Sequence, residues 1–139
     1  MIGATLDSSV YVRALHFGGP AALLIGRARA GDIRIDISDA ILNETTRVLR
    51  DKFQWNGYRI QEARGRLLSL CNRVSPTVKL SIVKEDPDDD RILECAATAN
   101  SDFIITEDKD LLRVNQYCNA RILTIAQFVK LVTRERTQR

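Results

Sequence analysis

The sequence is poor in histidine and cysteine, the residue types on which many catalytic and metal sites depend. Among its 139 residues there are one histidine, His16, and three cysteines. A single histidine excludes RNA cleavage by a pair of histidines, and a Ser-His-Asp triad would have to use His16. A zinc site made of several histidines or of four cysteines is excluded as well.

The three cysteines, Cys71, Cys95 and Cys118, lie far apart and form no CxxC pair. Such spacing predicts small apolar side chains in a reducing compartment and not a disulfide framework. The N-terminus lacks the basic stretch and apolar run of a secretory signal. No apolar run approaches the roughly 20 residues that span a membrane. We therefore expect a cytoplasmic protein without membrane contact.

Charge of both signs is abundant, with 21 lysines and arginines against 18 aspartates and glutamates. The resulting net charge of +3 permits a nucleic-acid partner without requiring one. A chain of this length buries about two thirds of its unfolded surface and can form one core without disulfides. We expect a single domain over residues 1–133, followed by a polar, frayed tail over residues 134–139.

Short apolar runs alternate with segments of helical period along the chain. Strands are expected at residues 4–6, 33–37, 78–83, 103–105 and 121–123, and helices at 10–15, 21–30, 39–51, 61–73, 90–100, 110–115 and 125–133. This alternation predicts an α/β fold in which helices cover both faces of a mostly parallel sheet. Ligands of such sheets lie beyond the carboxyl ends of the strands.

Carboxylates occur at the places where this fold would gather a ligand site. Asp7 and Asp108 each come directly after a predicted strand, and Asp89 or Asp90 begins a helix at the same side of the sheet. Glu44 lies near the edge of the buried stripe of its helix. Taken alone, each has an ordinary explanation as a helix cap or a solvated boundary residue.

Taken together, the carboxylates favour a metal site. Three carboxylates that converge in one crevice repel each other unless a cation neutralises them. Oxygen ligands without a nearby histidine select Mg²⁺ or Mn²⁺ and argue against zinc. Such a site polarises a phosphoryl oxygen and lowers the pKa of a bound water, which points toward phosphodiester hydrolysis.

Four stretches of the chain together resemble the PIN-domain family, in particular the VapC-type toxins of toxin–antitoxin systems. They are LDSSV at 6–10, ILNETTRVL at 41–49, DPDDDRILECA at 86–96 and DFIITEDKDLL at 102–112. The resemblance extends from Leu6 to about Phe128. It implies a three-layer α/β/α fold and a Mg²⁺- or Mn²⁺-dependent ribonuclease. It also implies an RNA substrate and a cognate antitoxin, and it leaves a homodimer open.

The resemblance also assigns roles to individual residues. The catalytic acids it implies are Asp7, Glu44, Asp89 and Asp108. The metal ligands would be Asp7, Asp108 and Asp89, for which Asp90 is the competing choice. Three further residues, Ser9, Thr106 and Asp110, would support the ligands through hydrogen bonds. Ser9 stands where the family often has asparagine, and Asp110 serves equally well as a helix cap.

The middle of the chain is basic and contains aromatic residues. Arg47, Arg50 and Arg59 are candidates for binding the RNA backbone beside the acidic pocket, although a solvated helix face explains each one as well. Phe53, Trp55 and Tyr58 connect two helices, where they would stack on bases or pack the helix corner, and we favour packing. The resemblance implies that helices in this region receive the antitoxin.

Other classes of protein fit the acidic pattern less well. A PIN-like RNA-binding or RNA-processing module with weak or no nuclease activity is the main alternative, and the intact set of four acids favours the enzyme. A response-regulator receiver would require a second acid at the first strand and a lysine just after a late strand. A haloacid-dehalogenase phosphatase would require an aspartate at the position of Ser9.

Overall fold

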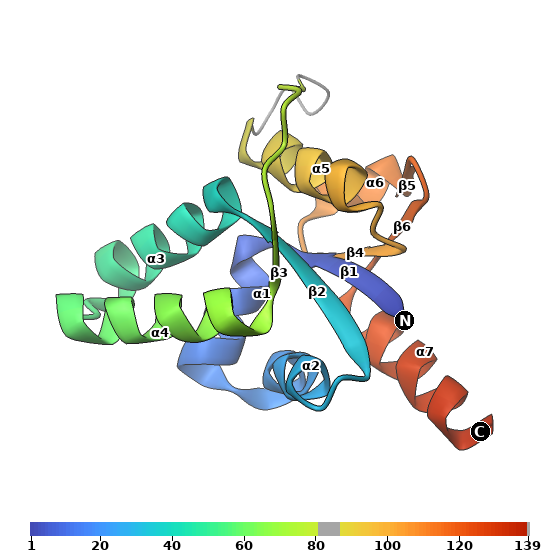
Figure 1. Ribbon diagram of the computed structural model, residues 1–139, viewed down its shortest axis with the longest axis horizontal. Helices are drawn as coiled ribbons and strands as arrows, with labels where there is room; N and C mark the ends of the chain where they lie inside the picture. Colours follow the sequence, from blue (N-terminus) through green and yellow to red (C-terminus); the bar gives the residue numbers. More distant parts are fainter. Residues whose placement is uncertain (81–86, 139) are drawn as a thin grey trace.

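A sheet of six strands forms the centre of the protein (Figure 1). The structure is a computed structural model that describes residues 1–80 and 87–138. The strands are β1 (Ile2–Leu6), β2 (Ile33–Ser38), β3 (Asn72–Val74), β4 (Phe103–Ile105), β5 (Gln116–Tyr117) and β6 (Ala120–Leu123). They lie in the order β3-β2-β1-β4-β6-β5, and only the pair β5 and β6 is antiparallel. The predicted mostly parallel sheet is confirmed.

Helices cover the sheet on both faces. They are α1 (Ser8–Val12), the π-helical segment η1 (Arg13–Phe17), α2 (Gly19–Arg29), α3 (Asp39–Phe53), α4 (Gly57–Leu70), α5 (Pro87–Ala99), α6 (Lys109–Val114) and α7 (Ile125–Gln138). α5 lies against β1 and β2 on one face, while α2 covers β2 from the other face with α7 beside it (Figure 1). α3 and α4 pack against each other and extend away from the sheet. The layers are those of an α/β/α sandwich.

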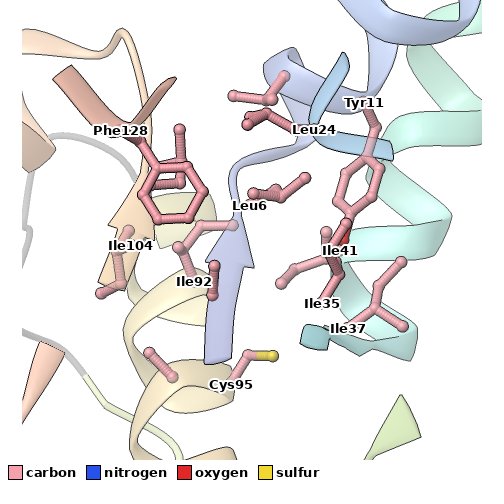
Figure 2. Packing of buried hydrophobic residues seen from close by; sticks show 14 of the residues in the cluster. Leu6, Tyr11, Leu24, Ile35, Ile37, Ile41, Ile92, Cys95, Ile104 and Phe128 are labelled. Carbon is pink, nitrogen blue, oxygen red and sulfur yellow. The ribbon is translucent and has the colours of Figure 1, made fainter. Parts of the chain in front are cut away.

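The core lies on both faces of the central strands. Consecutive residues of β4, Ile104 and Ile105, are both fully buried although their side chains point to opposite faces. Cys95 of α5, Leu24 of α2 and Tyr11 of α1 belong with Leu6 of β1 to one cluster of buried hydrophobic residues (Figure 2). A sheet covered on both faces leaves its strand ends as the accessible part.

One predicted strand is wrong. Residues 78–80 form no strand, and residues 81–83 lie outside the described part of the chain. The strand at this edge of the sheet is β3, which overlaps the end of the helix predicted at 61–73. The observed helix α4 ends earlier, at Leu70. The Asn72 side-chain amide donates to the buried Asp36 carboxylate at 2.9 Å, a tertiary contact that local helical propensity does not anticipate.

Helix ends also differ from the predictions elsewhere: α2, α4 and α5 begin two to four residues earlier than expected, and α3 ends two residues later. The helix expected at 10–15 begins at Ser8 and changes to π-helical geometry over Arg13–Phe17. α7 continues past its expected end at Thr133 to Gln138, because no glycine or proline stops it. The short strand β5 was not predicted. No helix among the described residues is long and apolar enough to cross a membrane.

The cysteines follow the prediction only in part. Cys95 is fully buried, as expected of a small apolar side chain, and Cys71 is half-buried. Cys118 is exposed, so the expectation of a buried filler is wrong there. It lies at a tight turn between β5 and β6 and has a positive φ of 53°. None of the three forms a disulfide.

Candidate active site

Two neighbouring parallel strands in the middle of the sheet bring their carboxyl ends to one edge. β1 and β4 pair so that Leu6 lies opposite Ile105, and the Asp7 backbone N–H donates to the Ile105 carbonyl at 2.9 Å. The next residues, Asp7 and Thr106, are therefore in contact although 99 positions separate them in the sequence. This is the edge at which parallel α/β sheets bind ligands.

The Thr106 hydroxyl connects the two aspartates of this edge. Thr106 Oγ1 donates to Asp7 Oδ2 at 2.7 Å and accepts the backbone N–H of Asp108 at 3.0 Å. Asp108 Oδ1 in turn accepts the backbone N–H of Asp110 at 2.8 Å and caps α6. The hydroxyl and the helix cap hold both carboxylates in fixed orientations.

The aspartates lie in a pocket of about 370 Å³. Most of its charged lining is acidic, with six carboxylates from Asp7, Glu44, Asp88, Asp89, Glu107 and Asp108. Two basic residues, Arg13 and Lys52, complete the charged lining. The strand ends, α3 and the first turn of α5 thus contribute to one negatively charged depression.

No lysine or arginine of the described residues forms an ion pair with the Asp7 carboxyl. Burial raises its pKa above the usual value of 3.8, and the charge of Asp108 raises it further. Hydrogen bonds from Thr106, Ser8 and the Ser9 backbone partly oppose this rise. Only 8% of Asp7 is exposed, and the groups that dominate the shift include no lysine or arginine. A cation that entered the pocket would therefore stabilise the charged form.

The carboxylates of the pocket offer oxygen atoms as ligands, and a hard divalent cation prefers oxygen ligands. Among residues 1–80 and 87–138, no three acidic, histidine or cysteine side chains converge into a ready metal site. The carboxylates Asp7, Asp89 and Asp108 are the best placed to hold an ion in the pocket. They would have to draw closer together around it.

The structure brings the four predicted catalytic acids, Asp7, Glu44, Asp89 and Asp108, into this one pocket. Asp89 and its alternative Asp90 are equally buried, at 3% exposure, but only Asp89 lines the pocket.

The residues predicted to support these acids are placed differently from one another. Ser9 lines the pocket, whereas Thr106 lies fully buried beneath it. The Asp110 side chain pairs with Arg113 at 2.9 Å, so its contribution to the site is its backbone N–H.

The three arginines predicted to bind RNA have other contacts and do not line the pocket. Arg47 forms an ion pair of 2.6 Å with Glu44, which lies at the pocket. Arg50 pairs with the neighbouring Asp51 at 3.0 Å. The Arg59 guanidinium lies 3.6 Å from the centre of the Trp55 ring, in a cation–π contact.

Two basic residues line the pocket: Lys52, which belongs to the basic middle of the chain, and Arg13, which was missed at the level of sequence. Lys52 follows Glu44 and Val48 at the i, i+4, i+8 spacing of one helix face, and this spacing could have identified it. Arg13 lies in the π-helical segment η1, for which the sequence shows no clear signal. Both side chains are exposed.

The aromatic residues of the basic region mostly pack the helix corner. The Trp55 side chain is 6% exposed, and its Nε1–H donates to His16 Nδ1 at 3.1 Å. The Phe53 ring lies 4.2 Å from the His16 ring. These contacts confirm the packing role predicted for Phe53 and Trp55, whereas Tyr58 is 80% exposed.

The fold is an α/β/α sandwich around a mostly parallel sheet, with an acidic pocket beyond the ends of the central strands. These two features define the class of protein. The sequence matches the family model of the PIN domain over residues 4–110, and the chain belongs to this family. PIN domains are in general nucleases. No curated protein matches the sequence.

The fold is similar to that of a chain in the crystal structure of VapBC2 from Rickettsia felis bound to a DNA fragment from their promoter. The TM-score is 0.64, and the match covers 88% of this chain and 98% of that chain. The sequence identity is 15%, so this likeness concerns the fold alone.

Proposed function

We propose that the protein is a Mg²⁺- or Mn²⁺-dependent endoribonuclease that hydrolyses RNA phosphodiester bonds at the acidic pocket. The observation that carries this proposal is the buried Asp7 carboxylate, whose pKa is raised by burial and by Asp108 and which has the Thr106 hydroxyl as its closest partner. Perturbed carboxylates in a cleft are typical of catalytic sites. Membership of the PIN-domain family supports the same class of reaction.

Asp7, Asp89 and Asp108 would hold the cation, since all three line the pocket. Asp90 is the weaker choice because it lies outside the pocket lining. When bound, a divalent cation neutralises the carboxylates, polarises the scissile phosphate and lowers the pKa of the attacking water.

The residues of the chain orient this chemistry. Thr106 directs its hydroxyl proton at Asp7 Oδ2, which fixes the plane of that carboxylate. The backbone N–H of Asp110 holds Asp108 Oδ1 in the same way. Arg47 pairs with Glu44, which lines the pocket and whose carboxylate would accept a proton from the attacking water.

We further propose that the protein is the toxin of a toxin–antitoxin pair. The resemblance of its motifs to VapC-type toxins and the fold likeness to a chain of VapBC2 support this role. An antitoxin partner, a homodimer and a cytoplasmic location belong to the same proposal.

Cleavage of a structured RNA in Mn²⁺, with and without EDTA, tests the enzyme. Asp7→Asn and Asp108→Asn should lower the rate by at least about 100-fold, the scale expected when a charge-stabilising group is lost. Asp32→Asn, which removes an aspartate remote from the pocket, is the matched control and should cleave at the wild-type rate.

Two results would contradict the proposed enzyme. Cleavage that survives EDTA would show that no divalent cation is needed. A folded Asp7→Asn variant with the wild-type rate would remove Asp7 from the mechanism. RNA binding without any cleavage in Mn²⁺ would favour the alternative from the sequence, a PIN-like RNA-binding module.

A further inference from the structure

A second cavity adjoins the acidic pocket. It measures about 580 Å³ and lies between the end of η1 and the start of α7. Its lining is mostly apolar and includes Phe17, Pro20, Ala21, Ile125 and Ala126. Arg13 and Glu107 line this groove and the acidic pocket alike. A ligand could therefore occupy both spaces at once.

Arg13 at this boundary is available for an anion. Its side chain is exposed, and within the described part of the chain it forms no ion pair or side-chain hydrogen bond. The other shared residue, Glu107, is already engaged, because its Oε1 accepts the backbone N–H of Ile125 at 3.0 Å. An arginine in this position suits a phosphate, to which it can donate two parallel hydrogen bonds.

Phe17 presents an aromatic ring at the same groove. Its side chain is 69% exposed, yet two neighbours hold it in near-perpendicular ring contacts. The ring centres of His16 and Phe53 lie 4.7 and 5.6 Å away at interplanar angles of 87° and 86°. An exposed but fixed aromatic ring is the surface on which an unpaired base stacks.

The backbone of this segment is unusual in two ways. Arg13–Phe17 is π-helical, a geometry that is rare and frequently found at functional sites. Gly18 and Gly19 follow with positive φ angles of 81° and 69°, which other residues rarely adopt. As a result, the groove beside Phe17 is bordered by bare backbone.

We propose that the groove is a nucleobase subsite in which Arg13 binds a phosphate of the substrate and the adjacent base stacks on Phe17. The inference rests on the proposed function and specifies its substrate as single-stranded RNA. A base paired in a duplex is stacked between its neighbours and cannot enter such a groove. The acidic pocket acts on the backbone, and the groove holds the base next to it.

Binding of a short fluorescein-labelled single-stranded RNA to the full chain carrying Asp7→Asn, in Mg²⁺, tests the subsite without cleavage. Adding Phe17→Ala should weaken the affinity by about tenfold or more, as expected for loss of a stacked base. Phe17→Tyr, which keeps the ring, should bind as before. Leu23→Ala is the matched control, because Leu23 is a comparably exposed apolar residue (61%) outside the groove.

Abasic substitutions make the test specific for the base. Replacing one nucleotide at a time by an abasic one should reduce the affinity of the Phe17-containing protein at one position. The same replacement should have no further effect once Phe17 is alanine, because the two changes remove the same contact. Arg13→Gln should weaken binding of the intact and the abasic RNA equally.

The inference is overturned if Phe17→Ala binds like the parent protein, if it binds no worse than Leu23→Ala, or if the parent protein binds no RNA. It is also overturned if duplex RNA binds as tightly as single-stranded RNA. The proposed enzyme is judged separately, on Mn²⁺-dependent cleavage by the protein with Asp7 intact. If Phe17→Ala cleaves RNA with an unchanged KM, the subsite is rejected and the proposed enzyme is retained. If RNA binding depends on Phe17 but no cleavage occurs, the subsite is retained and the proposed enzyme is rejected.

Discussion

Two aspartates, Asp7 and Asp36, are buried on neighbouring strands of the same sheet, and the protein treats their charges in opposite ways. Asp36 in β2 is fully buried and accepts hydrogen bonds at 2.7 and 3.1 Å from the Arg34 guanidinium. The Asn72 amide at 2.9 Å and the Ser101 hydroxyl at 2.7 Å complete its partners. Asp7, at the end of β1, has a hydroxyl partner in Thr106 and a like charge nearby.

The comparison shows that burial alone does not mark a functional carboxylate. Asp36 has an arginine built into the fold, and its network ties β2 to β3 and to Ser101 before β4. Asp7 is nearly as buried, but no lysine or arginine of the described residues forms an ion pair with it. A buried charge without a built-in counter-charge costs stability, and this cost indicates a role other than folding.

Removing the Asp36 carboxylate should have the largest effect on the stability of the fold. Asp36→Ala should lower the free energy of unfolding by about 3 kcal/mol, at the low end for a broken buried ion pair because Arg34 can turn to solvent. Urea denaturation measures this change. Asp36→Asn, which keeps the size and one acceptor, should cost less. A loss below that of an average surface substitution would show that the network contributes little to stability.

Displacing Arg34 from Asp36 by a substitution at Gly3 should have an intermediate effect on stability. A side chain at Gly3 would collide with the Arg34 guanidinium, so Gly3→Ala should push Arg34 off Asp36 and cost about 1–3 kcal/mol. Gly26→Ala is the matched control, since a Cβ there meets nothing within 4 Å. As a substitution inside helix α2, it should stabilise by about 0.5–1 kcal/mol. Equal melting temperatures for the two variants would contradict the explanation.

Neutralising Asp7 should change the stability of the fold less than the substitutions at Asp36 and Gly3, and in the opposite direction. The pKa of Asp7 is raised in the folded state, so the wild type loses stability as the pH rises from the unfolded value toward the folded one. Near pH 7 and without divalent cations, Asp7→Asn should therefore melt a few degrees higher than the wild type.

The pH and metal dependence of melting check this sign. The two melting temperatures should converge as the pH falls below the usual aspartate value of 3.8. Mn²⁺ should raise the melting temperature of the wild type more than that of Asp7→Asn. A lower melting temperature for Asp7→Asn near pH 7 would mean that the Asp7 charge is compensated after all.

Chemical modification of the cysteines should have the smallest effect on stability. Burial raises the pKa values of Cys71 and Cys95 to about 12, with a further contribution from the Asp36 charge. Iodoacetamide near pH 7 should therefore modify the exposed Cys118 and leave the other two unreacted, with little change in stability. Mass spectrometry of digested protein locates the label. Rapid labelling of Cys95 in the native protein would show that this interior is open.

The sequence predicts the sheet and its acidic edge because both depend on local patterns. β4 is predicted with its observed bounds, since three consecutive apolar residues suit a strand buried on both faces. Asp7 and Asp108 are predicted to meet because parallel strands end at the same edge. Glu44 is singled out by its place near the edge of a buried helix face, but its role as a catalytic acid comes from the family resemblance.

The features that the sequence does not predict depend on contacts between distant residues. β3 forms where Asn72 reaches Asp36, 36 positions away, although its residues continue a helical pattern. The difference between Asp7 and Asp36 depends on Arg34 and on which residues surround each carboxylate. Arg13 was missed because the π-helical geometry of η1 has no distinctive local pattern.

The order in which the chain is synthesised has a consequence for the pocket. Asp7 is made before its partner Thr106, which follows 99 positions later. A nascent chain therefore lacks Glu107 and Asp108 of the pocket lining until β4 has emerged and paired with β1. Under the proposed function, the ribosome that makes the chain meets no complete active site until Asp108 has been synthesised. Under the same proposal, a chain released before β4 would lack ribonuclease activity for the same reason.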